Sequence, residues 1–198
     1  MASSGLGAPV VVVGGEVIAI PPEVLISGGG IDSPNARLRV DVGEPSFFSG
    51  RQFRTFKELN IGLGATYVVK AVVPLDIILY GLELALISGE MKLETVVGGT
   101  EGGAFSETLP IFPRNTMSER PTPLYTPQTV LTAGGTHTGG TVLDLLWTKT
   151  ADNAQFAGSV GQVPGDERGV GAGTYYFRLN AIIAATGVFR ARWEERLP

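Results

Sequence analysis

The chain has 198 residues, with 15 Lys and Arg against 19 Asp and Glu and a formal net charge of −4, so it lacks the basic surface that binds a nucleic-acid backbone. It contains no cysteine, which excludes disulfides, thiolate metal sites and cysteine nucleophiles within it. The 28 glycines and 13 prolines separate short apolar runs without a collagen-like period, which indicates many turns between short strands.

Residues 1–34 are predicted to form an extended arm. Two β-branched runs, residues 10–13 and 16–20, are separated by Gly14 and Gly15 and followed by a proline pair and a glycine-rich loop. No basic segment precedes them, so a secretory signal is not expected. An apolar arm can add a strand to an exposed sheet edge. We therefore expect the most apolar part of the arm to contact another subunit or a partner through Val10, Val11, Val12 and Val13.

Residues 35–198 are predicted to form the main domain. Its clearest strand is ARLRVDV at residues 36–42, in which Leu38, Val40 and Val42 alternate with polar side chains. Residues 51–59 instead place apolar side chains three apart and lack a strong helix cap, so we expect this segment to be irregular or briefly helical.

The remaining chain is predicted to consist of short strands joined by turns. The stretch 67–88 approaches membrane-spanning length, but Lys70, Asp76 and Glu83 would each be costly in a bilayer, so it is assigned to core strands. Near the end, residues 174–183 and 187–195 are predicted to pair as a hairpin. The other expected strands are 65–73, 77–86, 91–97, 107–111, 129–132 and 141–147.

This pattern predicts an all-β fold. About nine or ten short strands occur without the long helices that alternate with strands in α/β proteins. We expect an antiparallel β-sandwich, of jelly-roll type, preceded by the N-terminal arm.

The single histidine, His137, lies in the glycine-rich segment GGTHTGG at residues 134–140. A related segment, GGTEGG at residues 98–103, has no histidine, which favours a strand connection over a metal or catalytic site. We therefore expect an exposed turn histidine. Two hypotheses stay open: that the two glycine loops lie side by side at a subunit or partner contact, and that His137 makes that contact sensitive to pH.

No catalytic constellation is found in the sequence. There is no nucleophile elbow and no phosphate-binding loop, and His137 would be the only histidine base. The adjacent carboxylates Asp166–Glu167 and Glu194–Glu195 would point to opposite faces of a strand, so they are expected to be solvated rather than to act as a glycosidase pair. The chain is predicted not to be an enzyme, and no cofactor or metal is expected.

Two weaker binding hypotheses were considered. Asp32 and Asn35, or Asp166 and Glu167, could offer oxygens to calcium, but neither spacing completes a calcium loop. Four aromatic side chains could instead form a sugar-stacking platform, although core packing is favoured for them: Trp147, Tyr175, Tyr176 and Trp193.

Several segments resemble virion structural proteins of short-tailed double-stranded DNA bacteriophages. The resemblance covers roughly residues 35 to 196. It is found in FKELNI at 56–61, GGTEGGAFSETLPIF at 98–112, QTVLTAGGTHTGGTVLDL at 128–145, GDERGVGAGTYYF at 165–177 and GVFRARWEER at 187–196.

The resemblance implies an assembly role similar to that of jelly-roll decoration or cement proteins on phage capsids. The expected partners are the major capsid protein and, in a homotrimer, other copies of the chain, with no nucleic acid or membrane contact. The expected location is the capsid surface of the virion, after assembly in the host cytoplasm. The low charge, the arm and the unpaired strand edges agree with such a role. The alternative is a tail or fibre component, either an adaptor or a host-glycan-binding module.

Overall fold

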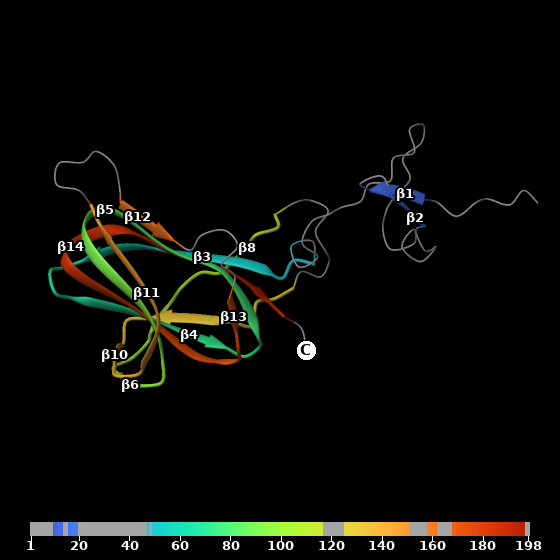
Figure 1. Cartoon of the computed structure of the whole chain (residues 1–198). Coiled ribbons are helices and arrows are strands. Elements are labelled where there is room, and N and C mark those ends of the chain that lie inside the picture. Colours follow the sequence, from blue (N-terminus) through green and yellow to red (C-terminus); the bar gives the residue numbers. More distant parts are fainter. Residues whose placement is uncertain are drawn as a thin grey trace, which may run out of the picture. The chain divides into compact units, whose positions relative to one another are not determined.

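A computed structural model describes the backbone of residues 10–13, 16–19, 47, 49–116, 125–150, 158–161 and 168–196 (Figure 1). The chain separates into two compact units, Met1–Gly43 and Glu44–Pro198. In the first unit, β1 (Val10–Val13) pairs with β2 (Glu16–Ala19) as an antiparallel hairpin. The strand predicted at residues 36–42 lies outside the described residues.

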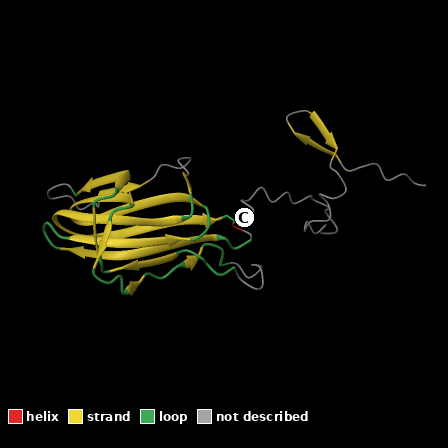
Figure 2. Ribbon diagram, turned by 90° about the horizontal axis from the view of Figure 1, so that it is seen from below, coloured by secondary structure: helices red, strands yellow, loops and turns green. Residues whose placement is uncertain are grey.

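The second unit is built on an antiparallel sheet with the strand order β11-β5-β14-β4-β9-β7, and β3, β8, β12 and β13 attach to the same sheet. Figure 2 shows the long strands of this unit lying side by side. The remaining two strands, β6 and β10, form a separate pair. The bounds are β3 Gln52–Ile61, β4 Thr66–Val73, β5 Ile77–Val97, β6 Thr100–Gly102, β7 Glu107–Thr108, β8 Phe112–Pro113, β9 Val130–Ala133, β10 Thr136–Thr138, β11 Thr141–Lys149, β12 Gly158–Gly161, β13 Arg168–Val170 and β14 Gly173–Glu195.

Two long strands organise this sheet. β5 has 21 residues and β14 has 23, and they pair with each other from Tyr175↔Val97 to Glu195↔Ile77. On its other edge, β14 pairs first with β4 and then with β3, while β5 pairs with β13, β12 and β11 in turn. The sheet curls upon itself, which confirms an antiparallel all-β fold of the sandwich kind. The jelly-roll connectivity stays a prediction.

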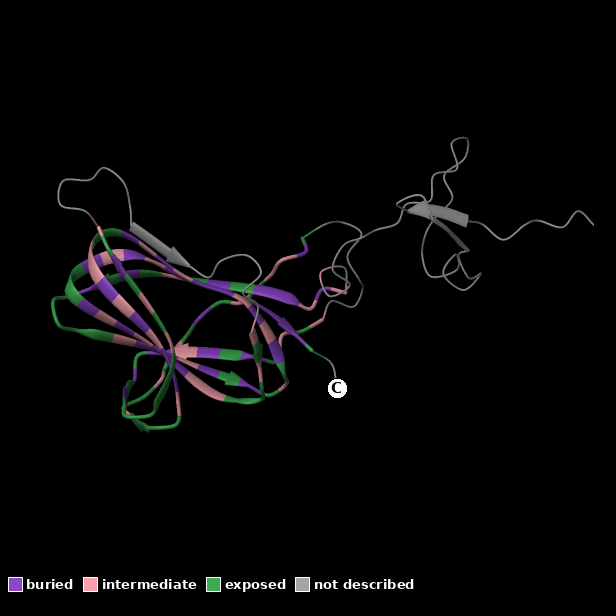
Figure 3. Cartoon of the chain, viewed as in Figure 1, coloured by how far each residue is buried: buried purple, intermediate pink, exposed green. Residues whose placement is uncertain are grey.

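The core lies between the two inner faces of the bent sheet. Buried and partly exposed residues alternate along β5 and β14, as the bands in Figure 3 show. The pairs Leu179↔Leu93 and Phe189↔Leu84 place large buried side chains opposite each other on these faces. Trp193, near the end of β14, extends the same apolar cluster.

The bend depends on close backbone contact between β5 and β14. The pairing register shifts between Ala181 and Gly187, where the strands change direction. Gly89 has a φ of 88°, and a Cβ atom there would lie 2.2 Å from the carbonyl oxygen of Ala184. A Cβ on Gly187 would lie 2.2 Å from the carbonyl oxygen of Ala85. Only glycine allows the two backbones to approach this closely.

The prediction of an irregular or helical segment at residues 51–59 is wrong, because these residues belong to β3. Phe53, Thr55 and Leu59 are buried, whereas Arg54 and Phe56 are exposed, so the true period is two. The three-residue spacing of apolar side chains arose because Phe56 lies on the outer face, where it stacks on Phe112. Pairing with β14 overrides the local pattern.

The predicted C-terminal hairpin is also wrong. Residues 173–195 form the single strand β14, and the segment 182–186 is a bulged bend rather than a turn. The strands predicted at 77–86 and 91–97 are likewise one strand, β5, which follows β14 through the bend. A small, glycine-containing interruption in an apolar run is compatible with either structure, and only the neighbouring strand decides between them.

Substituting Gly89 with Ala is expected to lower the free energy of unfolding by at least about 2 kcal/mol, because the new Cβ would collide with backbone atoms of β14. Gly62→Ala is the matched control, since a Cβ at Gly62 meets nothing within 4 Å. Urea unfolding of the full chain measures both. Equal midpoints for the two variants would contradict the close approach at the bend.

Candidate functional site

The two glycine-rich segments lie side by side in the same chain. β6 and β10 pair antiparallel, with His137 opposite Glu101 and Thr138 opposite Thr100. A Cβ on Gly99 would lie 2.6 Å from the carbonyl oxygen of Thr138, so glycine is required for this approach. The hypothesis that the loops are adjacent is confirmed within one chain. Whether a partner contacts them stays a prediction.

His137 is buried, so the expectation of an exposed turn histidine is wrong. Its side chain is 6% exposed, and its ring stacks on Tyr176 with centroids 3.8 Å apart and an interplanar angle of 14°. The Nε2 atom lies 2.7 Å from the carbonyl oxygen of Gly98, and because a carbonyl can only accept, Nε2 carries the proton. The Nδ1 atom is buried and has no partner in the described part of the chain.

The stack covers a small apolar cluster on the outer face of the sheet. Tyr176 packs there with Val68 and Val96, and Phe105 lies against them. These side chains come from β14, β4, β5 and the segment after β6. The β6–β10 pair packs over this cluster on one face of the sheet. His137 supplies the flat ring that lies against Tyr176 and thereby fastens β10 to the sheet.

Glu101 fastens the other strand of the pair. Its carboxylate lies 2.7 Å from Lys70 Nζ and accepts a hydrogen bond from the Tyr176 hydroxyl. The hydrogen bond from Lys70, with that from Tyr176, holds the pKa of Glu101 below its usual value. Burial, together with the bond to Glu101, raises the pKa of Tyr176 to about 12. Near neutral pH the tyrosine is therefore a donor and the glutamate an anion.

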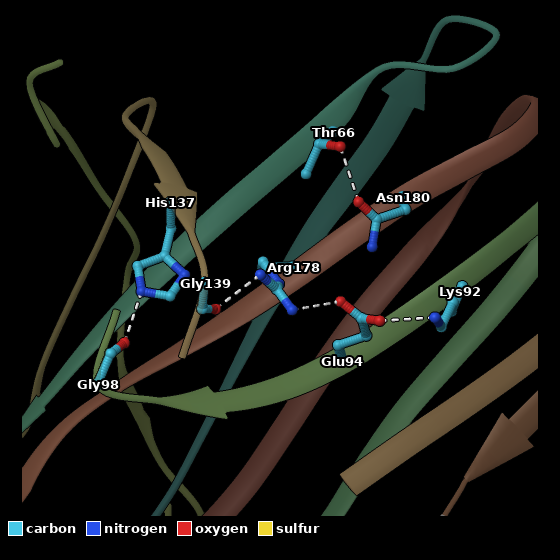
Figure 4. A network of polar contacts seen from close by, with 8 residues as sticks. All are labelled: Thr66, Lys92, Glu94, Gly98, His137, Gly139, Arg178 and Asn180. Carbon is cyan, nitrogen blue, oxygen red and sulfur yellow. Dashed lines mark hydrogen bonds and ion pairs between the residues drawn. The ribbon is translucent and has the colours of Figure 1, made fainter. Parts of the chain in front are cut away.

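A polar groove runs beside His137, and Figure 4 shows its contacts. Arg178 donates to the carbonyl oxygen of Gly139 at 3.0 Å and lies 2.8 Å from Glu94. Lys92 lies 2.6 Å from the same carboxylate. Burial alone would raise the pKa of Glu94, but Lys92 and Arg178 together lower it. Thr66 donates to Asn180 at the other end of the groove.

The hydrogen bonds and ion pairs that line the groove hold neighbouring elements of the fold together. Glu94 is paired with both Lys92 and Arg178, and Arg178 ties the loop after β10 to β14 through Gly139. Within the described residues, no group of three or more His, Asp or Glu side chains is placed to hold a metal ion. Among those residues, too, no helix is long and apolar enough to cross a membrane.

The carboxylates Glu194 and Glu195 are buried, so the expectation that they are solvated is wrong. They do point to opposite faces, as adjacent residues in a strand must. Glu194 accepts a hydrogen bond from the Tyr80 hydroxyl. Glu195 is fully buried and accepts from the backbone N–H groups of Gln128 and Thr129, at distances of 2.8–3.1 Å.

The other candidates are distributed over the chain. Val10, Val11, Val12 and Val13 form β1, but their side chains lie outside the described part of the structure. The possible calcium ligands Asp32, Asn35, Asp166 and Glu167 also lie outside it. Trp193 and Tyr176 are buried, as core packing predicts, whereas Trp147 is 57% exposed. The four aromatic side chains therefore do not share one exposed platform.

Sequence reasoning missed an exposed apolar strip on β11. Four of its nine residues are exposed large hydrophobic side chains: Val142, Leu143, Leu145 and Trp147. β11 pairs with β5 on one edge, and no other described strand pairs with its second edge. The apolar run TVLDLLW was visible in the sequence, but only the strand order shows that it lies at the end of a sheet.

Comparisons with models of protein families, with curated proteins and with solved structures gave no match to this chain. The site is therefore interpreted from its own geometry.

Replacing His137 with Ala is expected to lower the free energy of unfolding by about 2 kcal/mol, because the variant loses the stack on Tyr176 and the bond to Gly98. Thr138→Ala is the matched control, since Thr138 is the exposed neighbour on the same strand, and it should change stability by less than about 0.5 kcal/mol. Urea unfolding compares them. A His137→Ala protein as stable as wild type would show that the ring does not fasten β10.

Proposed function

We propose that this protein is a structural component of the virion of a short-tailed double-stranded DNA bacteriophage, and specifically a decoration or cement protein that binds the major capsid protein. The exposed apolar strip on β11 is the observation that carries the proposal. The resemblance of the sequence to phage virion proteins supplies the identity of the partner, and the strip supplies a surface on which that partner docks.

The β11 strip combines two features of a protein-binding surface: a strand edge without a described partner strand, and exposed apolar side chains. Its backbone presents one edge that no described strand occupies, and soluble proteins usually protect such an edge with charge, proline or a bulge. β11 has a bulge between Val142 and Asp144 and ends at the charged Lys149, but Leu145 and Trp147 lie exposed between these two features. Packing against a partner would remove their apolar surface from water and offer the free N–H and C=O groups a strand to pair with.

A second group of exposed apolar side chains lies at the bend of the sheet, which the chain reaches just after β11. Thr150, which follows β11, donates to the carbonyl oxygen of Gly89 through both its backbone N–H and its hydroxyl. Next to Gly89, Ile87 is 73% exposed. Ile182 and Ile183 are exposed on the adjoining bend of β14. Exposed apolar side chains at both places support binding to another protein.

The homotrimer belongs to the same proposal. A decoration protein gains affinity when several copies bind at once, because each further contact is intramolecular. A closed ring of three copies would place three β11 strips on one capsid surface. Mass measurement of the purified full-length protein tests this part of the proposal separately from capsid binding.

Substituting Leu145 with Lys is expected to weaken binding to capsids by about tenfold or more, because a charge would be buried in the interface. Val130→Lys is the matched control, since Val130 is also an exposed apolar residue but lies on β9. Co-sedimentation of the full-length protein with heads that lack it measures binding, and urea unfolding checks that both variants fold. Equal binding by the two variants would contradict docking through β11.

A tail or fibre component is the second candidate, and the exposed Trp147 favours it, because an aromatic face on the surface can stack on a host glycan. The number of copies per virion distinguishes the candidates. A decoration protein is expected in hundreds of copies over the head, whereas a tail component is expected as a small multiple of three or six at one vertex. Quantitative mass spectrometry and electron cryomicroscopy of virions would measure this.

A further inference from the structure

The second unit contains an apolar cavity with a volume of about 250 Å³. It lies between the inner faces of the bent sheet, because its walls include residues from both halves of β14, Phe177 and Trp193. Leu79 and Leu82 from β5 and Leu131 from β9 complete the apolar wall. The cavity shares no residue with the groove beside His137, and it meets the β11 strip at Leu143, which belongs to both.

The size of the cavity sets the size of a ligand. A dry cavity of about 150 Å³ admits one benzene molecule. The larger volume here therefore holds an apolar body with about eight to ten heavy atoms.

Two residues that line the cavity each carry a buried polar atom that has no partner in the described part of the chain. The Trp193 indole Nε1 and the Thr129 hydroxyl Oγ1 are buried, and neither forms a hydrogen bond within the described chain. Their side chains are 2% and 4% exposed, so bulk water does not compensate them. Buried polar groups normally have a partner, because leaving one unpaired costs free energy. A ligand with a polar oxygen would satisfy the indole N–H, which can only donate, and the hydroxyl.

The charges around the cavity disfavour an anionic ligand, and its largely apolar wall disfavours an ion of either sign. Glu195 is buried directly behind Thr129 and accepts its backbone N–H at 2.8 Å, so a second carboxylate in the cavity would be repelled. At the rim, Arg168 lies 2.9 Å from Asp144, so its charge is already balanced.

We propose that this cavity is a binding site for a neutral, mainly apolar small molecule that carries a hydroxyl or carbonyl oxygen. The oxygen pairs with Thr129 and Trp193, and the apolar body lies against Phe177 and the leucines of β5. This site does not depend on the assembly role, because none of its polar contacts lies on the β11 strip.

Fluorescence of Trp193 reports binding directly. Trp147 and Trp193 are the only tryptophans, so full-length protein with Trp147→Phe has a single emitting indole, in the cavity wall. Three probes are titrated: benzyl alcohol, ethylbenzene, which replaces the hydroxyl by a methyl group of similar size, and benzoate, which carries a charge. We expect saturable changes in emission with the first two and at least tenfold weaker binding of benzoate than of benzyl alcohol.

Variants at Thr129 test whether the site recognises the hydroxyl of the ligand or only accepts any apolar molecule that fits the cavity. Thr129→Val is expected to weaken benzyl alcohol binding by about fivefold and to leave ethylbenzene binding unchanged, because only the hydroxyl loses a partner. Thr129→Ser keeps the hydroxyl and should bind benzyl alcohol nearly as well as the parent does. Thr148→Val is the matched control, since Thr148 is a buried threonine that does not line the cavity.

Three results would overturn the proposal. The first is that neither benzyl alcohol nor ethylbenzene gives a saturable response. The second is that Thr129→Val changes the binding of both probes equally or of neither, which would mean that the polar atoms do not select the ligand. The third is that benzoate binds most tightly, which would assign the site to an anion at Arg168. None of these results depends on capsid binding, so they leave the proposed virion role untouched.

Discussion

The backbone pairing of β5 with β14 is the interaction on which the rest of the structure depends. The two strands stay paired on both sides of a sharp bend, and every other described strand of the sheet is joined to one of them directly or through one or two intervening strands. Gly89 and Gly187 allow the bend because they remove the Cβ atoms that would collide there. One continuous sheet can thus enclose a core that two separate sheets would otherwise have to build.

Away from the bend, the outer face of the sheet carries a small apolar cluster that would otherwise be exposed. Tyr176 and its neighbours are covered by a pair of short strands that come from two glycine-rich segments. These strands are too short to be stable alone. They are held by side-chain contacts to the main sheet: the His137 ring lies on Tyr176, and Glu101 contacts Lys70 and the tyrosine hydroxyl. His137 therefore packs against Tyr176 as a buried side chain and is not a solvent-exposed loop residue.

The sequence predicted the fold class because period-two alternation and turn residues are local signals. It did not predict that residues 173–195 form one strand, since a bulged bend and a hairpin turn share the same local composition. The similarity of GGTEGG and GGTHTGG was visible in the sequence, and the structure shows that the two segments lie side by side as the pair β6 and β10. The burial of His137 and Glu195 depends on residues distant in the chain, such as Tyr176 and Gln128, so no local pattern could show it.

Glu195 connects the end of the fold to the cavity. A fully buried carboxylate is tolerated only where several donors satisfy it, and here the N–H groups of Gln128 and Thr129 do so. The same bonds fix the backbone of Thr129 and hold its side chain in the cavity wall. The buried carboxylate of Glu195, which orders the cavity wall at Thr129, also repels an anion in the cavity. Glu195 therefore accounts both for the fixed position of Thr129 and for the proposed exclusion of anionic ligands.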